Sequence, residues 1–306
     1  MSSQVIWSCI YPKKKNLQSE QFDYIRNYVD TVEQVIQSAS FADPECGYAR
    51  YIDVPSFVDY FIHTELSLNA DGYKRSAYFY KEKQNADGTG GKLVAGPVWD
   101  YNLAYGNANF ANADNPEAWN FEGASNNPTP AMWQRLLQDP AFRKAVKKRY
   151  KALRKDVLSN KTINAYIARH AKLLAPCIKR HFEKYPELLV TEEEKAQFKP
   201  HSFGAFPPLG DFPMPDSIPP FPGGFSPMGE FGGFSAFNSV GMFAAYRVSS
   251  YDEEIETLKA WLANRLAFLD HNIERFDKDW EPRIQELKEI KMQQFPGGFP
   301  FPFPTN

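Results

Sequence analysis

The stretch of residues 57–106 constrains the fold of this chain more than any other. Apolar residues recur at helical spacing over 57–66, which predicts a helix with one buried face. Asp53 is a suitable cap for this helix, and Pro55 fits its first turn. The Asp-Gly pair at 71–72 then ends the helical pattern.

A β-hairpin is predicted after this helix. Residues 76–83 are rich in aromatic side chains typical of a strand, residues 85–91 contain the turn signals Asp-Gly and Gly-Gly, and residues 92–98 form the returning strand. If the strands pair in register, Asp71 and Asp100 are brought to the same end of the hairpin, although they are far apart in the sequence.

Asp71 and Asp100, with Ser76 and Asn102 beside them, offer oxygen ligands for a divalent cation. Hard cations such as Mg2+ often take only one or two carboxylates and complete their shell with substrate phosphates. A protein-kinase site has the same order, with Asp-x-x-x-x-Asn, then a hairpin, then a metal-binding Asp. Here the first string is Asp71-Gly-Tyr-Lys-Arg-Ser76. Spacing alone leaves open that Asp71 is only a turn residue and Asp100 only a cap.

Two segments resemble the core of the CotH family, the spore-coat-protein-H-like atypical protein kinases. They are NADGYKRSAYFYK at 69–81 and GKLVAGPVWDYNLAYGN at 91–107, and further similarity lies at 133–142 and 255–273. The resemblance covers most of the chain outside its low-complexity segments. It implies ATP-dependent phosphorylation of Ser or Thr in protein substrates, with Mg2+ or Mn2+.

The resemblance also implies roles for individual residues. By position, Asp71 would orient the substrate hydroxyl and Asp100 would hold the metal. Asn69 and Ser76 would lie at the nucleotide cofactor, and Asn102 would be a weaker metal ligand. Ser76 stands where the family often has Asn, and Asn102 stands where it often has a second Asp. Because Asn102 lacks the charge of an Asp, we expect a lower metal affinity.

A nucleotide-binding lobe is the part of the family pattern that we do not find. Family members build this lobe, with its Lys, from a long upstream region, whereas this sequence starts at Met1 with a short polar lead-in, and we recognise no Gly-rich phosphate loop in it. We therefore expect the chain alone to have little or no kinase activity. No signal peptide is recognised at the start of the chain, although the family is often exported, so the localisation stays open.

Composition and charge exclude several other classes. The net charge of -2 gives no basic face for nucleic acid, and no apolar run is long enough for a transmembrane segment. Cys9, Cys46 and Cys177 show neither a disulfide framework nor a metal spacing, and we expect buried free thiols. A hydrolase has little support, because no Gly-x-Ser-x-Gly motif is present.

Further helices are predicted on either side of the hairpin. Ser19 is the expected cap of a helix over 19–37, and residues 130–187 are expected to be helical, with Asp139-Pro140 as one helix start. Glu65 could reach the site behind the metal ligands, but a solvated helix charge is the preferred interpretation. One apolar stripe of the helical region is expected to pack on the core: Ile163, Tyr166, Ile167 and Leu174.

The surface features of this region leave two interpretations each. The basic residues over 143–151 suit a solvated helix face, and docking of an acidic partner is the alternative. The Asn-rich loop over 107–127 suits a substrate-facing loop better than a calcium site, with Trp119 and Phe121 holding it to the core.

Phe, Pro and Gly dominate an internal segment and the end of the chain, where they favour disorder over a helix or a central strand. The expected organisation is a CotH-like catalytic lobe over 1–197, a low-complexity insert over 198–249, closing helices of the same lobe over 250–294, and a low-complexity tail over 295–306. A mobile linker is the plainer interpretation of the insert, and an adhesive segment that supports self-association is the alternative.

The predicted fold is α+β: a mostly helical, kinase-like C-terminal lobe with one catalytic β-hairpin, plus the disordered insert and tail. The leading functional hypothesis is a metal- and ATP-dependent protein Ser/Thr kinase lobe. The alternative is a non-catalytic surface binding or scaffolding protein that keeps the kinase-like fold and assembles through its Phe/Pro/Gly segments.

Overall fold

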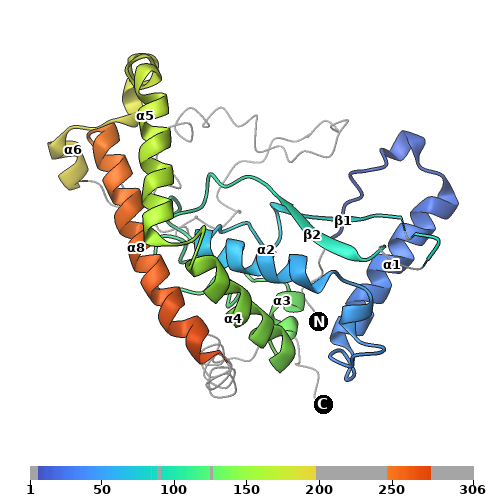
Figure 1. Cartoon of the computed structure of the whole chain (residues 1–306). Helices are drawn as coiled ribbons and strands as arrows, with labels where there is room; N and C mark the ends of the chain where they lie inside the picture. The colour runs from blue at the N-terminus through green and yellow to red at the C-terminus, as the bar shows by residue number, and fades with distance from the viewer. Residues whose placement is uncertain (1–5, 84, 88–90, 125–126, 198–246, 277–306) are drawn as a thin grey trace, which may run out of the picture.

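A computed structural model describes residues 6–83, 85–87, 91–124, 127–197 and 247–276. It confirms a mostly helical α+β fold, in which one antiparallel hairpin lies against the helical body (Figure 1). The helices are α1 (Ser19–Gln37), α2 (Val54–Ser67), α3 (Ala131–Leu136), α4 (Pro140–Arg154), α5 (Asn160–Lys184), α6 (Glu192–Gln197) and α8 (Tyr251–Arg275). The strands are β1 (Ala77–Lys81) and β2 (Leu93–Val98).

Helix α2 lies at the centre of the molecule, between the hairpin and α4 (Figure 1). It begins as predicted, because the Asp53 carboxylate accepts a hydrogen bond from the Ser56 backbone N–H at 2.9 Å. Phe57 and Phe61 are fully buried on it. The ring of Trp133 from α3 lies 5.5 Å from that of Phe57, so the core is built largely from packed aromatic rings.

The hairpin packs on α2 through β2 and contains one irregularity. Ala77 pairs with Val98, but Phe79 pairs with Ala95, so β2 carries one residue more than β1 between these pairs. This β-bulge coincides with Gly96, whose φ of +134° favours glycine. The extra residue therefore lies directly before the end of β2 that leads to Asp100.

The capping predictions for α1 and α4 differ in outcome. Ser19 is not the cap of α1, because the helix begins there and Gln18 forms a reciprocal capping box with Gln21. Asp139 does cap α4, accepting from the Ala141 N–H at 2.8 Å. Its second oxygen accepts from the buried Tyr48 hydroxyl, so this cap also joins α4 to the core.

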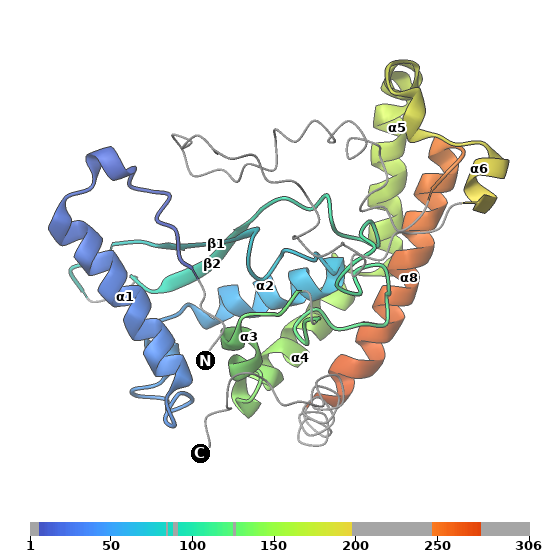
Figure 2. The same ribbon diagram turned by 180° about the vertical axis from the view of Figure 1, so that it is seen from behind.

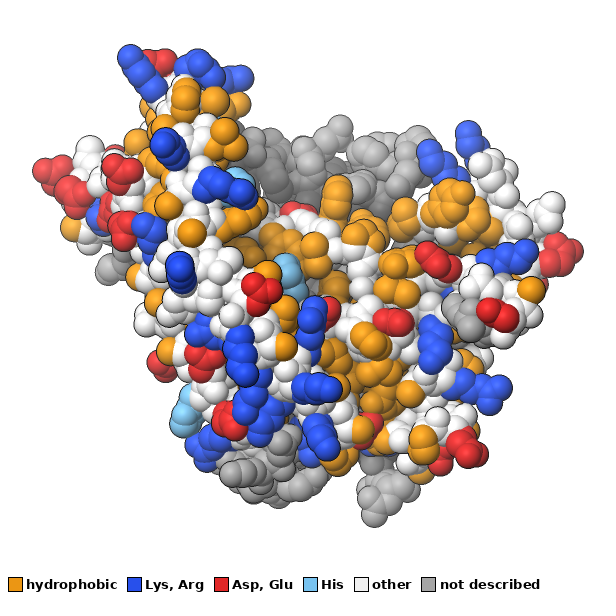
Figure 3. Space-filling model, viewed as in Figure 1, with side chains coloured by type: hydrophobic (Ala, Val, Ile, Leu, Met, Phe, Trp, Pro, Cys, Tyr) orange, Lys and Arg blue, Asp and Glu red, His pale blue; other side chains and the backbone are white. Residues whose placement is uncertain are grey.

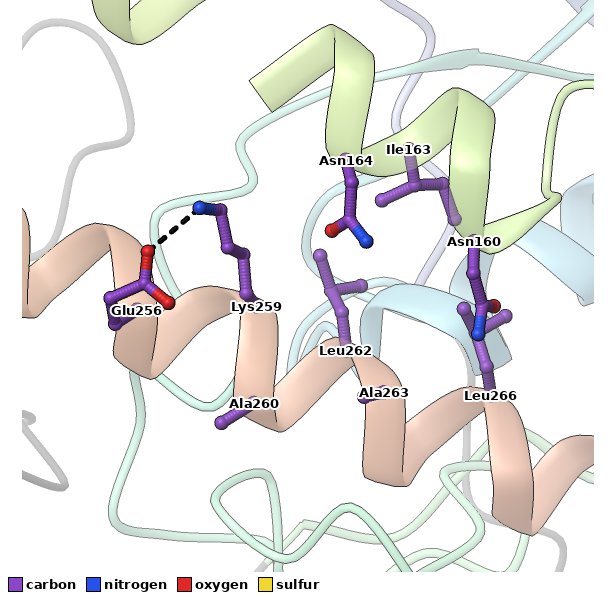
Figure 4. A pocket seen from close by; sticks show the side chains of 9 residues that line it. All are labelled: Asn160, Ile163, Asn164, Glu256, Lys259, Ala260, Leu262, Ala263 and Leu266. Carbon is purple, nitrogen blue, oxygen red and sulfur yellow. Dashed lines mark hydrogen bonds and ion pairs between the residues drawn. The ribbon is translucent and has the colours of Figure 1, made fainter. Parts of the chain in front are cut away.

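Helix α5 departs most from the sequence-based expectation. None of its side chains in the described part of the chain is buried, and Tyr166 is 59% and Leu174 48% exposed. It runs beside α8, and the two helices enclose a shallow groove lined by Ile163, Asn164, Leu262 and others (Figure 4). Of the predicted apolar stripe, Ile163 is partly buried and packs against the core, whereas Tyr166 and Leu174 are exposed.

Helix α8 closes the body as expected. Its cap is Ser250, whose hydroxyl accepts from the Glu253 N–H at 3.1 Å. The Glu253 carboxylate accepts from the Ser249 N–H at 2.8 Å. Leu266, Leu269 and Ile273 are buried against the core. Most of the predicted insert, the closing residues beyond 276 and the whole tail lie outside the described residues.

Part of the basic face of α4 forms ion pairs within the chain. Arg149 forms an ion pair with Asp59 of α2 at 2.7 Å, and Lys151 with Glu274 of α8 at 2.5 Å. Figure 3 shows Lys and Arg side chains interspersed with Asp and Glu over this region. A solvated, internally paired face thus describes it better than a free basic patch.

The structure also bears on the cysteines and on the prediction of no transmembrane segment. Cys9, Cys46 and Cys177 are all exposed, so the prediction of buried thiols was wrong. Among the described helices, none has the length and apolar character that crossing a membrane requires.

Candidate functional site

The hairpin brings the two candidate carboxylate residues to one end of the molecule's sheet. The pairing of Ala77 with Val98 places Ser76 and Trp99 at the open end of the hairpin. The Asp71 turn enters β1 at this end, and Asp100 leaves β2 at the same end. This is the arrangement that the hairpin pattern predicts.

Asn69 links the two segments through a single side chain. Its amide nitrogen donates to the Asp100 carbonyl at 3.0 Å, and its amide oxygen accepts from the Asp71 backbone N–H at 3.2 Å. Asn69 is fully buried. The backbones of Asp71 and Asp100 therefore lie on either side of one amide group, and that group is occupied by contacts within the chain.

Asp100 has an unusual backbone and a free side chain. Its φ of +57° lies in the left-handed region, which costs a non-glycine residue energy and is found most often for Asn and Asp. The bond from Asn69 to its carbonyl holds this conformation. The residue is exposed, and within the described part of the chain its carboxylate makes no hydrogen bond or ion pair. A carboxylate presented in this way is available to a ligand.

The Asp71 turn is compact. The Asp71 carbonyl accepts from the backbone N–H groups of Lys74, Arg75 and Ser76 at 3.0–3.1 Å. Its side chain is only 15% exposed and lies 3.5 Å from the exposed guanidinium of Arg75. Ser76 is buried, with 7% exposure.

Asn102 lies farther along, in an exposed position, and its backbone carbonyl accepts from the Asn107 side chain at 3.0 Å. The five predicted site residues thus come from two adjoining turns. Three of them, Asn69, Asp71 and Asp100, are connected by hydrogen bonds, whereas Ser76 is bonded to the turn through its backbone and Asn102 makes no such bond to the other four among the described residues.

Lys74 is a charged residue of this turn that the sequence analysis did not single out. Its ammonium donates to the Pro128 carbonyl at 3.0 Å. Burial, reinforced by Arg75, lowers the pKa of Lys74 to about 8, and the nearby Asp71 opposes this shift. A cation beside Asp71 could contact an anionic substrate. Its position three residues after Asp71 was the only sequence signal for it.

Glu65 is a buried residue and not a solvated helix charge, so the preferred expectation for it was wrong. Its carboxylate accepts from the Tyr73 hydroxyl at 2.7 Å and from the Asn120 and Phe121 backbone N–H groups at 3.0 and 2.9 Å. Arg265 of α8 lies 3.2 Å away as its counter-charge. Tyr73 belongs to the Asp71 turn, so Glu65 supports the site from behind.

The Asn-rich segment after Asp100 packs against the end of α2 and against α8 (Figure 2). Trp119 and Phe121 are buried, which confirms that they hold this segment to the core. Asn120 and Asn127 contact the turn that carries Asp71, and nothing in their sequence spacing indicates this role.

The donor set fits Mg2+ or Mn2+ completed by phosphates better than a metal enclosed by protein alone. The described residues contain no group of three or more His, Cys, Asp or Glu side chains that could hold a metal ion. Asp100 instead offers one free carboxylate, with Asp71 in the adjoining turn. One or two carboxylates plus substrate phosphates is the usual protein contribution to a Mg2+ site.

A turn with an Asp, a hairpin and a second Asp, set into a helical body, follow one another here as in protein kinases. The comparisons with known proteins agree with this class. The family model described as CotH kinase protein matches residues 4–269, and the chain belongs to the CotH kinase family. Neither the curated proteins nor the solved structures gave a match.

Proposed function

We propose that this chain carries the metal-binding and acceptor-orienting residues of an ATP-dependent protein Ser/Thr kinase. The observation that carries the proposal is the Asp100 carboxylate, which is exposed, free of partners among the described residues, and held on a left-handed backbone by Asn69. Residues with strained backbone conformations are found most often at functional sites, which supports a ligand-binding role for this carboxylate.

The residues take separate roles in this proposal. Asp100 binds Mg2+ or Mn2+, which neutralises the charge of the nucleotide phosphates when bound. Asp71 accepts a hydrogen bond from the hydroxyl of the Ser or Thr substrate and so orients it. Lys74 adds positive charge beside Asp71. Catalysis of phosphoryl transfer rests mainly on such positioning and charge stabilisation.

The remaining predicted residues support these two carboxylates. Ser76 and Asn102 are candidate weaker oxygen ligands, toward the nucleotide and the metal respectively. Asn69 serves the nucleotide site by orienting Asp71 and Asp100, because both ends of its amide are already bonded to them.

Binding of Mn2+ tests the proposal directly. Loss of the electron paramagnetic resonance signal of free Mn2+ measures its affinity, and Asp100→Ala is expected to weaken binding about 10- to 100-fold. Asp114→Ala is the matched control, because it removes an exposed carboxylate from the Asn-rich segment. Equal affinity of Asp100→Ala and wild type would refute the metal role, and a loss confined to Asp114→Ala would favour a cation site in the Asn-rich loop. Any transfer of phosphate from ATP to a protein substrate should require both Asp71 and Asp100.

A binding or scaffolding role is the second candidate, and the exposed apolar side chains of α5 favour it. Tyr166, Leu173 and Leu174 are each about half exposed or more. Deleting residues 198–245 separates the two candidates. The deletion should leave Mn2+ binding intact if the chain is a kinase lobe, and it should abolish assembly, measured by light scattering, if the chain is a scaffold.

A further inference from the structure

The carbonyl groups directly before Asp71 are held by two side chains from a distant part of the chain. The Asn120 amide donates to the Asn69 carbonyl at 2.6 Å, and the Asn127 amide donates to the Ala70 carbonyl at 2.6 Å. All four residues are buried. The Asn69 carbonyl also accepts from the Gly72 backbone N–H at 2.9 Å, whereas among the described residues the Asn127 amide is the one donor to the Ala70 carbonyl.

The two donors are themselves firmly placed. The Asn120 backbone N–H donates to Glu65 at 3.0 Å, and its carbonyl accepts from the Thr129 hydroxyl at 2.8 Å. Asn127 exchanges two backbone hydrogen bonds with Ala124, at 2.9 and 3.1 Å. The amides therefore reach the Asp71 turn from a segment whose own backbone is bonded to Glu65 of α2.

Arg265 extends this frame to α8. Its guanidinium donates to the Pro116 carbonyl at 2.9 Å and to the Ala118 carbonyl at 2.5 Å, and it pairs with Glu65. The backbone of the segment that carries Asn120 is thus bonded to Arg265 of α8 and to Glu65 of α2. Asparagine amides can then hold the turn at a fixed distance from both helices.

We propose that Asn120 and Asn127 are positioning residues, which fix the backbone of Asn69 and Ala70 and thereby set the placement of Asp71 relative to Asp100. The inference rests on the proposed function. The side chain of Asn69 bonds both Asp71 and Asp100, so any shift of the Asn69 backbone moves its amide and is transmitted to both carboxylate residues. Outer residues that orient metal ligands commonly control metal affinity in this way.

Asn127→Ala tests the inference, with Mn2+ affinity and amide hydrogen exchange as the two measurements. We expect Mn2+ affinity to fall about 10- to 100-fold. We also expect faster exchange of the amides of Asp71 and Ser76, which donate within the turn, and unchanged exchange in β1 and β2. Asn272→Ala is the matched control, because it removes an Asn amide that donates to the Phe268 carbonyl within α8, and it should change neither measurement.

Unchanged Mn2+ affinity in a folded Asn127→Ala protein would overturn the inference. If the wild type binds no Mn2+ at all, the proposed function fails, and the exchange of the Asp71 turn alone then decides the inference: no acceleration overturns it. If Asn127→Ala does not fold, Asn120→Ala removes the neighbouring donor, and Asn127→Gln keeps an amide at a longer reach. The same two criteria apply to both variants.

Discussion

Arg265 and Glu65 form an ion pair of 3.2 Å in which neither side chain has any exposure to solvent. The pair joins α8 to α2 at the place where the Asp71 turn and the Asn-rich segment meet. Burial raises the pKa of Glu65 to about 6, and Arg265, Tyr73 and two backbone N–H groups oppose the rise. The carboxylate form of Glu65 is thus stabilised by the Arg265 cation and by three hydrogen bonds, from Tyr73, Asn120 and Phe121.

Glu65→Gln should lower the free energy of unfolding by about 3–5 kcal/mol, because it leaves the Arg265 cation buried without a counter-charge. Chemical denaturation monitored by tryptophan fluorescence measures the change. Arg149→Ala is the control, since its pair with Asp59 is about half exposed and should cost about 1 kcal/mol or less. Equal costs for the two variants would contradict a structural role for the buried pair.

Asp100→Gly and Asp100→Ala should both weaken Mn2+ binding but differ in stability. Alanine must hold the left-handed φ of +57° that glycine adopts freely, so the glycine variant should be the more stable by about 1 kcal/mol. Thermal unfolding of the two purified variants gives the difference. A glycine variant less stable than the alanine variant would argue against the left-handed backbone at this position.

Binding of inorganic tripolyphosphate should weaken as the pH rises through about 8, the pKa of Lys74. Below that pH Lys74 is a cation that attracts the anion, and above it the attraction is lost. Isothermal titration at about pH 7 and about pH 9 should show an affinity about tenfold lower at the higher pH, in line with the loss of one charge-assisted hydrogen bond.

Lys74→Gln should bind tripolyphosphate weakly at both values of pH. Lys148→Gln on the outer face of α4 should keep the wild-type response. A pH dependence that survives in Lys74→Gln would assign the titration to another group.

Asp139→Ala should cost more stability than an ordinary cap removal. It removes the N-cap acceptor of α4 and also leaves the buried Tyr48 hydroxyl without its partner, so about 2–4 kcal/mol is expected in denaturant unfolding. Ser159→Ala removes the exposed cap of α5 and should cost about 1 kcal/mol. Similar values for the two would mean that the Tyr48 bond adds nothing.

Local patterns predicted the elements around the hairpin well. The Asp53 cap and the spacing from Phe57 to Leu66 define α2, and the turn signals between two apolar runs define β1 and β2. These features are encoded within a few residues of one another. Asp71 precedes β1 and Asp100 follows β2, so antiparallel pairing brings the two residues to the same end of the hairpin.

Features that depend on contacts between distant segments could not be predicted. Glu65 has the spacing of a surface charge, and only the arrival of Arg265, 200 residues later, makes its burial possible. Asn120 and Asn127 bond backbone carbonyls, which leaves no pattern of side-chain types to recognise. The α5 stripe shows the reverse error, since helical periodicity reports an apolar face but not whether another element covers it.

The bulge beside Gly96 gives the length of β2 a direct chemical consequence. If the ladder instead continued unbroken from the Phe79–Ala95 pair, Ala77 would face Pro97 in place of Val98, and Trp99 and Asp100 would lie one pairing position farther from the Asp71 turn. The amide of Asn69 would then meet the peptide group of a different residue. The position of the proposed cation ligand thus depends on the number of residues in β2 as much as on the presence of the aspartate.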